Sequence, residues 1–409
     1  MSPVSILSNI SLGDGPTNND TSTVGEPTAA VAGSHMFMTG NWYCSQSTDG
    51  GTNWKHVDPF TALPSAAGGF CCDQVVLYDA RRRLWIWILQ YSRRNGANVF
   101  RLAAVHDGDF GNPGAWYWWD IAPTTLDSSW TQLWFDYPDA AVTADNLLIT
   151  FNVFNNVGDG QWQRAVVMRF PLATIDTRGT LGFNFWTTTQ NGSLRLTQGA
   201  GRTMYFASHN SSQQVRLFSW ADGQNGVNWW DINVTASSSA ISSNAPNNVN
   251  WLARADRRIT GACIGNGTIT LMWTAGSGTN RPRAYCRVVQ IAEATKQVTA
   301  QPDIWSSTRS WAYPAACTNN SGVLGFTAFY GGEDRHPGHI VGIREDNGTW
   351  STAYSRQGSH SPNEPKWGDY LSCRRHTPST NTWVASGYTL EGGATRTDIL
   401  PRIVRFSRV

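Results

Sequence analysis

The chain has 409 residues, a length that suits one large domain or two smaller ones. Its 31 Lys and Arg residues nearly balance its 29 Asp and Glu residues, so the formal net charge is only +2. Nucleic-acid-binding proteins usually carry clustered basic charge, and we therefore expect no nucleic-acid partner. No stretch approaches the roughly eighteen consecutive apolar residues of a transmembrane helix, so we expect no insertion into a membrane.

The first residues, MSPVSILSNISLGDG, lack the basic start and the continuous apolar core of a signal peptide. The sequence therefore predicts a soluble chain. A mature secreted protein whose signal peptide has been removed would look the same, so an extracellular location stays open.

Short alternating runs rich in Val, Ile, Thr, Trp and Tyr recur between clusters of Gly, Asn, Asp and Pro, while helical periodicity is scarce. This pattern predicts an all-β fold. One unit, a pair of strands joined by a polar turn, is repeated at residues 27–42, 73–91, 138–154, 194–210, 251–273, 313–330 and 369–388. The starts of these units are roughly 45 to 65 residues apart, a spacing typical of four-stranded propeller blades. We therefore predict a β-propeller of seven four-stranded blades.

The two ends of the chain contribute to the predicted ring. Residues 26–409 are expected to form a single propeller, and residues 1–25 an N-terminal strand followed by a polar connector. The run PVSILSNIS can pair with the C-terminal run LPRIVRFSRV and so remove the open edge of the last blade.

One turn has a distinctive composition, STDGGTNW, with Ser47, Asp49, Gly51 and Trp54 at fixed offsets. It resembles the Asp box of sialidase-like, or BNR-repeat, β-propellers. Weaker copies of the pattern occur at Asp222, Gly226 and Trp229, and at Asp346, Gly348 and Trp350. The resemblance implies a sialidase-like propeller in which these hairpin turns lie on the face away from the active site. Asp49 is therefore expected to stabilise a turn and not to catalyse a reaction.

Seven cysteines cannot all form disulfides within one chain. Cys71 and Cys72 are adjacent and can form only a vicinal disulfide, whereas Cys263 and Cys286 could face each other on neighbouring strands. The other cysteines are expected to be buried thiols. No paired Cys/His spacing of a zinc site is present.

One histidine-containing segment, GGEDRHPGH, places His336 and His339 close in sequence to Glu333 and Asp334. Such a group could bind a divalent metal, but a loop cluster of this kind is more often solvated. We therefore predict no metal site and no cofactor.

Candidate site residues follow from propeller geometry, because inner strands begin and second strands end on the same face, around the central channel. At the predicted starts of inner strands are Asp73, Asp136, Tyr137, Asp139, Trp251, Arg254, Tyr313, Asp369 and Tyr370. At the predicted ends of second strands are Trp42, Tyr91, Asn152, His209, Trp273, Tyr330 and Tyr388. Aromatic faces stack on sugars, and polar side chains bind their hydroxyls and carboxylates, so the expected partner is a carbohydrate or glycan.

From these positions we predict a catalytic set and a substrate-binding set. The catalytic candidates are His209, Asp139, Asp73, Asp369, Tyr313 and Tyr370. The substrate-binding candidates are Arg254, Trp42, Tyr91, Asn152, Trp273, Tyr330 and Tyr388.

Two reactions agree with these residues. Hydrolysis of a glycosidic bond needs two carboxylates, which Asp73, Asp139 and Asp369 can supply. Elimination next to a uronate needs a cation such as Arg254 and a base and an acid, for which His209 and the tyrosines are suitable. The Phe/Tyr-Arg-Ile-Pro motif of sialidases is absent from the sequence, which argues against sialidase activity.

Two functions without catalysis remain as alternatives. The second hypothesis is a glycan-binding lectin or adhesion propeller. Multivalent propeller lectins tend to repeat the same binding residues in every blade, whereas the predicted mouth residues differ from blade to blade, so this hypothesis ranks below the enzyme. A structural propeller that binds proteins through its Trp-rich rims is the third hypothesis.

Overall fold

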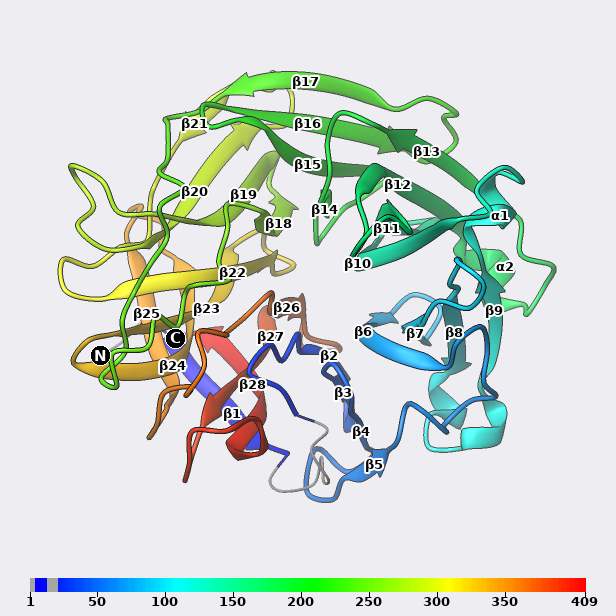
Figure 1. The fold of residues 1–409 in the computed structure, drawn as a ribbon, viewed down its shortest axis with the longest axis horizontal. Coiled ribbons are helices and arrows are strands. Elements are labelled where there is room, and N and C mark those ends of the chain that lie inside the picture. The colour runs from blue at the N-terminus through cyan, green and yellow to red at the C-terminus, as the bar shows by residue number, and fades with distance from the viewer. Residues whose placement is uncertain (1–3, 13–20) are drawn as a thin grey trace.

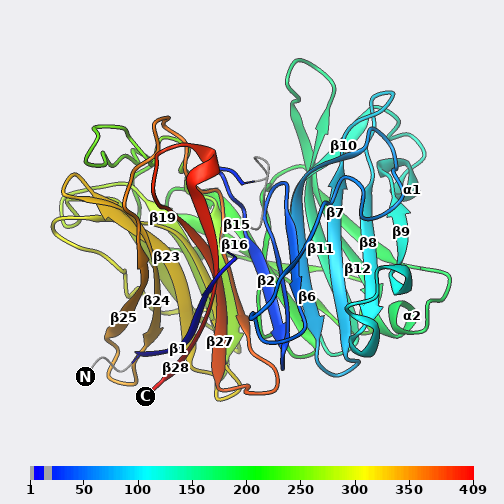
Figure 2. The same ribbon diagram turned by 90° about the horizontal axis from the view of Figure 1, so that it is seen from below.

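The computed structural model describes residues 4–12 and 21–409. Across these ranges the strands form seven four-stranded antiparallel sheets, arranged in a ring as the blades of a β-propeller (Figure 1). Seen from the side, the sheets stand around a central axis (Figure 2). The predicted all-β class and the prediction of seven four-stranded blades are confirmed. Two short helices, α1 (Pro123–Leu126) and α2 (Leu172–Asp176), lie in the loops of blades 2 and 3.

Each of the first six blades uses four consecutive strands, numbered from the channel outwards. Blades 1 to 3 contain β2 (Thr28–Ala32), β3 (His35–Thr39), β4 (Cys44–Ser47), β5 (Lys55–Val57); β6 (Phe70–Asp79), β7 (Leu84–Tyr91), β8 (Phe100–His106), β9 (Tyr117–Ile121); and β10 (Leu133–Val142), β11 (Asn146–Asn155), β12 (Trp162–Pro171), β13 (Asn184–Thr188). Blades 4 to 6 contain β14 (Arg195–Leu196), β15 (Thr203–Ser211), β16 (Gln214–Ala221), β17 (Asn228–Asn233); β18 (Ile259–Gly265), β19 (Thr268–Ala275), β20 (Tyr285–Ala292), β21 (Val298–Ala300); and β22 (Ser310–Thr318), β23 (Leu324–Gly332), β24 (Arg335–Arg344), β25 (Trp350–Gln357).

The seventh blade joins the two ends of the chain. It contains β26 (Ser372–Arg375), β27 (Thr382–Leu390), β28 (Ile399–Arg408) and, outermost, β1 (Val4–Ser11). β1 pairs antiparallel with β28, from Val4 opposite Arg408 to Ser11 opposite Arg402. This pairing covers the edge that β28 would otherwise expose. Residues 13–20 of the predicted polar connector lie outside the described residues.

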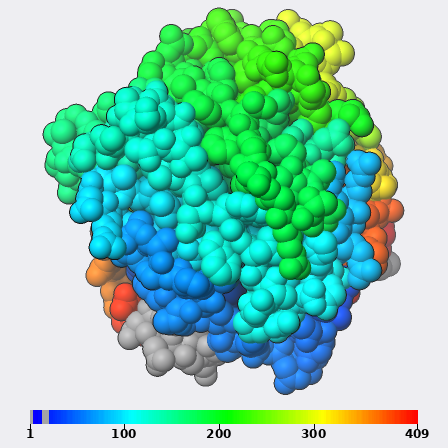
Figure 3. Space-filling model, turned by 90° about the vertical axis from the view of Figure 1, so that its right-hand side faces the viewer, coloured from blue at the N-terminus to red at the C-terminus, as the bar shows by residue number. Residues whose placement is uncertain are grey.

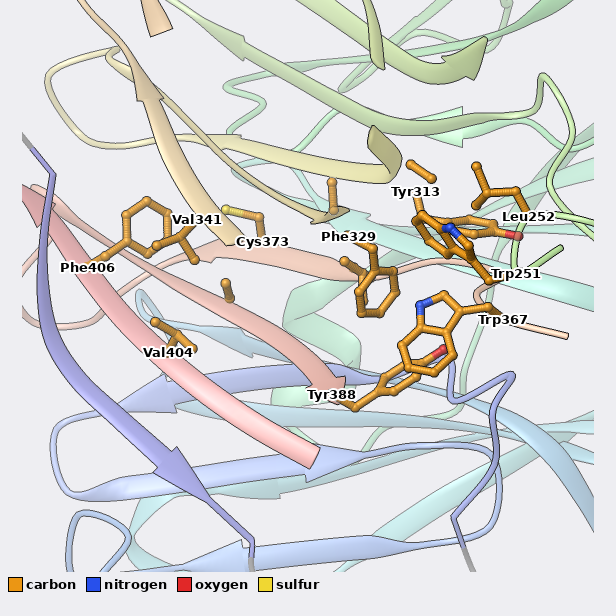
Figure 4. Close-up of a cluster of buried hydrophobic side chains, with 14 of the residues drawn as sticks. Trp251, Leu252, Tyr313, Phe329, Val341, Trp367, Cys373, Tyr388, Val404 and Phe406 are labelled. Carbon is orange, nitrogen blue, oxygen red and sulfur yellow. The ribbon is translucent and has the colours of Figure 1, made fainter. Parts of the chain in front are cut away.

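Apolar side chains fill the spaces between neighbouring blades. Among the described residues, the buried apolar side chains form seven clusters, and each is centred between two adjacent blades; the cluster between blades 6 and 7 also takes in side chains of the loop that precedes blade 5. In the cluster between blades 6 and 7, Val341 lies beside Phe406, and Phe329 lies beside Trp367 and Tyr388 (Figure 4). Because the second strand of a blade is covered on both faces, it becomes a continuous apolar run, as in LWIWILQY of β7. On the outside, blades 2 to 4 form one continuous surface (Figure 3).

The turn between β4 and β5 contains the Asp-box-like sequence. Ser47 Oγ donates a hydrogen bond to Asp49 and accepts one from the Gly51 amide, and the amide of Asn53 donates to Asp49. These bonds, first of all the one from Asn53, lower the pKa of Asp49 to about 2. Gly51 has a φ of 87°, which favours glycine. Strand direction places this turn at the end of the channel opposite the starts of the inner strands.

One predicted strand begins elsewhere. The inner strand of blade 5 begins at Ile259 and not at Trp251, because Trp251 and Leu252 lie in turns and are fully buried in the cluster of blades 6 and 7. Cys263 and Cys286 are separate buried thiols and do not form a disulfide.

The ring depends on apolar contact between its last and first blades. Ile403 of β28 is 1% exposed in that interface, whereas Leu7 of β1 in the same blade is 45% exposed. We expect Ile403→Ala to lower the free energy of unfolding by about 2 to 5 kcal/mol. Leu7→Ala, the matched control, should change it by less than about 0.5 kcal/mol. Chemical denaturation measures both, and equal effects would contradict this account of ring closure.

Candidate active site at the channel mouth

All seven inner strands contribute to the narrow part of the channel. The lining there includes one residue at the same position of each inner strand: Thr28, Val75, Asp139, Arg195, Thr260, Ala315 and Ser372. They leave a space of about 20 Å³, enough for roughly one water molecule. The channel is therefore closed below its mouth, and a ligand that enters from the mouth is held above this level.

A second set of seven residues forms the rim of the mouth. Each of them lies two positions earlier in the sequence than one of the residues named above. The members of this set are Glu26, Asp73, Tyr137, Ser193, Arg258, Tyr313 and Tyr370. Irregular backbone holds several of them there. β-bulges interrupt β6, β10 and β22 at Asp73, Tyr137 and Tyr313, and Glu26, Tyr137, Ser193 and Tyr313 have φ values between 46° and 59°. Bulges and positive φ values of this kind are concentrated at functional sites.

Four carboxyl groups meet at this rim. We call Glu26, Asp73, Asp136 and Asp369 the acidic cluster; they come from blades 1, 2, 3 and 7 and interact electrostatically with one another. Glu26, Asp73 and Asp369 are 6 to 7% exposed, and Asp136 is the most accessible. Residues far apart in the sequence thus bring four acids to one side of the mouth.

Burial raises the pKa values of Glu26, Asp73 and Asp136. Burial, followed by the negative charge of Asp136, raises the pKa of Asp73 to about 7. Burial and the charge of Asp73 raise the pKa of Glu26 well above its usual range, and burial also raises that of Asp136. Because the hydrogen bond between Glu26 and Asp73 favours the proton on Glu26, Asp73 is the member that titrates near neutrality.

Arginines neutralise the fourth acid. Arg258 donates to one oxygen of Asp369 at 3.1 Å, and Arg254 approaches the other oxygen at 3.4 Å. Arg258 also pairs with Asp256 at 2.7 Å and lies 4.6 Å from the centre of the Tyr137 ring. Burial opposes its charge, but Tyr137 and Asp369 hold the pKa of Arg258 above its ordinary value.

A cavity of about 520 Å³ opens beside the acidic cluster, between blade 4 and the loop that precedes blade 5. We call it the side pocket. Its walls are Trp162, Gln190, Gly192, Ser193, Ser208, His209, Ser239, Ala255, Asp256, Arg257, Arg258 and Ile259. Arg258 belongs both to this wall and to the ion pair with Asp369, so the side pocket adjoins the acidic cluster.

The predicted catalytic residues separate into three places. Asp73 and Asp369 belong to the acidic cluster, and His209 lines the side pocket. Asp139 is one layer deeper, in the narrow part of the channel, where it pairs with Arg195 at 3.5 Å and accepts a hydrogen bond from the Leu196 amide.

Tyr313 and Tyr370 belong to the rim and are at most 2% exposed. Among the described residues, neither phenol oxygen has a hydrogen-bond partner. Tyr370 lies edge-on to Tyr137, with ring centres 5.7 Å apart. Tyr313 packs on Gly368, where an added Cβ would lie 2.2 Å from its ring.

Most predicted substrate-binding residues are packed against protein. Tyr388 is 1% exposed, and its hydroxyl donates to the Thr23 carbonyl while accepting from the amides of Gly25 and Gly368. Since Glu26 and Asp369 follow these two glycines, Tyr388 positions part of the acidic cluster. Figure 4 shows Tyr388 grouped with Trp251, Tyr313, Phe329 and Trp367 in the buried cluster.

The remaining candidates form other contacts. Tyr91 lies under the guanidinium of Arg101, and Trp42 under that of Arg396. Tyr330 packs on Trp311, and Trp273 on His209. Asn152 accepts a hydrogen bond from the Ser193 amide, at the wall of the side pocket. Arg254 is the member of this set that touches the acidic cluster.

The structure tests the predictions for the adjacent cysteines and for the histidines of the segment GGEDRHPGH. Cys71 and Cys72 form a vicinal disulfide in the bulge directly before Asp73. The prediction that His336 and His339 lie on a solvated loop is wrong, because both belong to β24 and His339 is fully buried. In the described ranges no group of three or more His, Cys, Asp or Glu side chains is arranged to hold a metal ion.

Three residues with assigned interactions at the mouth were absent from the predicted catalytic and binding sets: Glu26 and Asp136 of the acidic cluster, and Arg258 of the rim. Comparing the residues that precede each inner strand would have aligned Glu26 with Asp73. Asp136 was recognised at a strand start, but the bulge between Asp136 and Asp139 determines which of the two reaches the cluster. Arg258 was hidden because its loop was taken for a strand.

No family model matches the sequence, and no curated protein matches it. Among solved structures, prolyl oligopeptidase B from Galerina marginata is similar with a TM-score of 0.51 at 9% identity, over 90% of this chain and 48% of that one. An α-L-arabinofuranosidase from Fusarium graminearum has a TM-score of 0.46 at 9% identity, covering 98% and 97% of the two chains. The sialidase of Trypanosoma rangeli has a TM-score of 0.40 at 11% identity, covering 81% and 54%. At such identities a structural similarity shows the fold alone. Within the described residues, no helix has the length and apolar character to span a membrane.

The raised pKa of Asp73 predicts a specific pH dependence of stability. Since the folded protein binds this proton more tightly than the unfolded chain does, the proton stabilises the fold below about pH 4, and this stabilisation is lost as pH rises through about 7. We therefore compare the unfolding free energy of the wild type with that of Asp73→Asn. The wild-type value minus the variant value should decrease by about 4 kcal/mol as the pH rises from about 4 to about 7.

Denaturant unfolding at a series of pH values measures this difference. The matched control is Asp231→Asn on the outer strand β17, where Arg216 lowers the pKa of Asp231. Its difference from the wild type should stay constant between pH 5 and 8. A constant difference for Asp73→Asn over the same range would contradict the assigned protonation.

Proposed function

We propose that the protein is a carbohydrate-active propeller enzyme that hydrolyses a glycosidic bond at the channel mouth. The observation that carries the proposal is the pKa of Asp73, about 7, in a cluster that contains three further carboxyl groups. A glycosidase needs one carboxyl group that keeps its proton near neutral pH and a second one that is ionised. The adjoining side pocket provides space of the size that small ligands occupy.

In the proposed reaction, Asp73 donates its proton to the glycosidic oxygen as the bond from the anomeric carbon to that oxygen breaks. Asp136, the most accessible member of the acidic cluster, stabilises the positive charge that develops on the sugar ring. A water molecule then adds its oxygen to the anomeric carbon, and its proton returns to a carboxylate of the cluster. The products are two saturated sugars, one with a new reducing end.

Other residues have supporting roles in this proposal. Gln90 donates a hydrogen bond to Asp136 at 2.9 Å and fixes its orientation. Arg258 and Arg254 balance the charge of Asp369. Trp162, in the wall of the side pocket, presents an indole on which a sugar ring can stack.

The test is product release from a panel of neutral and acidic polysaccharides, measured as reducing ends and as absorbance of unsaturated uronates. We expect saturated products from the wild type and a loss of about 100-fold or more in kcat for Asp73→Asn and for Asp136→Asn. Asp231→Asn, outside the mouth, should keep full activity.

Other results would contradict hydrolysis in distinguishable ways. Unsaturated products that disappear in His209→Ala would indicate an elimination reaction. Glycan binding without any product would indicate a lectin. Full activity of Asp73→Asn would remove the acidic cluster from the reaction.

A further inference from the structure

The side pocket contains a histidine whose ring nitrogens are only weakly engaged by the protein. Both ring nitrogens of His209 are buried, and among the described residues neither has a protein partner with regular hydrogen-bond geometry, although the backbone of Arg257 and of Ser211 lies near enough to act on the pKa of the ring. The ring lies edge-on to Trp273, with centres 4.7 Å apart. A buried polar group without a well-formed hydrogen bond is unfavourable, so such a group in a cavity wall points to a ligand or an ordered water.

The protonation of His209 indicates which ligand group it suits. Burial, and then the charge of Arg257, lower the pKa of His209 to about 4, so the imidazole is neutral at physiological pH. A neutral imidazole donates from one nitrogen and accepts at the other. A sugar hydroxyl, which both donates and accepts, complements either nitrogen.

Arg257, next to His209 in the pocket wall, forms no ion pair with a described residue. The next residue behaves differently, since Arg258 pairs with Asp256 and Asp369. The guanidinium of Arg257 donates one hydrogen bond, to the Ser237 carbonyl at 3.4 Å. A guanidinium has five donors and binds a carboxylate in a bidentate manner.

We propose that the side pocket is a subsite for a carboxylate-bearing sugar, with the carboxylate on Arg257 and a ring hydroxyl on His209. This inference rests on the proposed function, since it names the class of substrate for the same mouth. Arg258 joins the side pocket to the acidic cluster, so the acidic sugar would be next to the bond that is cleaved. Asp256 does not oppose this role, because Arg258 neutralises it at 2.7 Å.

Binding without turnover tests the subsite separately from the reaction. Isothermal titration calorimetry compares trimers of galacturonate, glucuronate and mannuronate with their methyl esters, which have the same rings but no charge. We expect at least one acidic trimer to bind the wild type tenfold or more tightly than its ester. Arg257→Gln should remove this difference and leave the affinity for the ester unchanged, whereas His209→Ala should weaken both ligands.

The control variant is Arg202→Gln, which removes an exposed arginine that pairs with Asp145 away from the mouth. It should bind like the wild type, and all variants should keep the wild-type Tm. Equal affinities for acid and ester, retention of the preference in Arg257→Gln, or no binding of any trimer would overturn the proposal. Preference for the acid without any hydrolysis would contradict the proposed function alone, and hydrolysis without this preference would contradict the subsite alone.

Discussion

Apolar packing between neighbouring blades is the interaction on which the rest of the structure depends. Each blade is too thin to bury both of its faces alone, and the clusters between blades provide that cover. The same contacts fix the angle of every blade, and so they direct the seven inner strands to one axis. Residues as distant in sequence as Glu26 and Asp369 become neighbours for this reason. The chemistry of the mouth is thus a consequence of the ring, although no apolar residue takes part in it.

The convergence of four acids has an energetic cost that the surrounding residues partly offset. Like charges in a site with little water favour protonation, which explains the raised pKa values of Glu26 and Asp73. Arg258 and Arg254 compensate Asp369, and Tyr388 fixes the backbone from which two of the acids project. Below them, the pair of Asp139 and Arg195 closes the channel. A cluster of acids that lowers the stability of the fold, and that arginines and a tyrosine nevertheless fix in place, is typical of functional sites.

The fold was predictable because its signals are local: alternating strands, polar turns and a unit that recurs seven times along the chain. The site was predictable only in part. Asp73 and Asp369 directly precede apolar strands, so their position followed from the repeat. Glu26 lies at the boundary between the predicted connector and the propeller, and a bulge places Asp136 in the cluster and Asp139 below it. The placement of His209 and Arg257 in one pocket wall depends on contacts between a blade and the loop before the next blade, which no local pattern reveals.

The central claim is that the mouth keeps a carboxylic acid protonated near neutral pH. Carbon-13 NMR of the side-chain carboxyl groups, in protein labelled at aspartate and titrated from pH 3 to 9, tests it directly. The account predicts one aspartate signal with a midpoint near pH 7 that is absent from the Asp73→Asn protein. Titration of every aspartate below about pH 5, close to the ordinary value for this side chain, would contradict it.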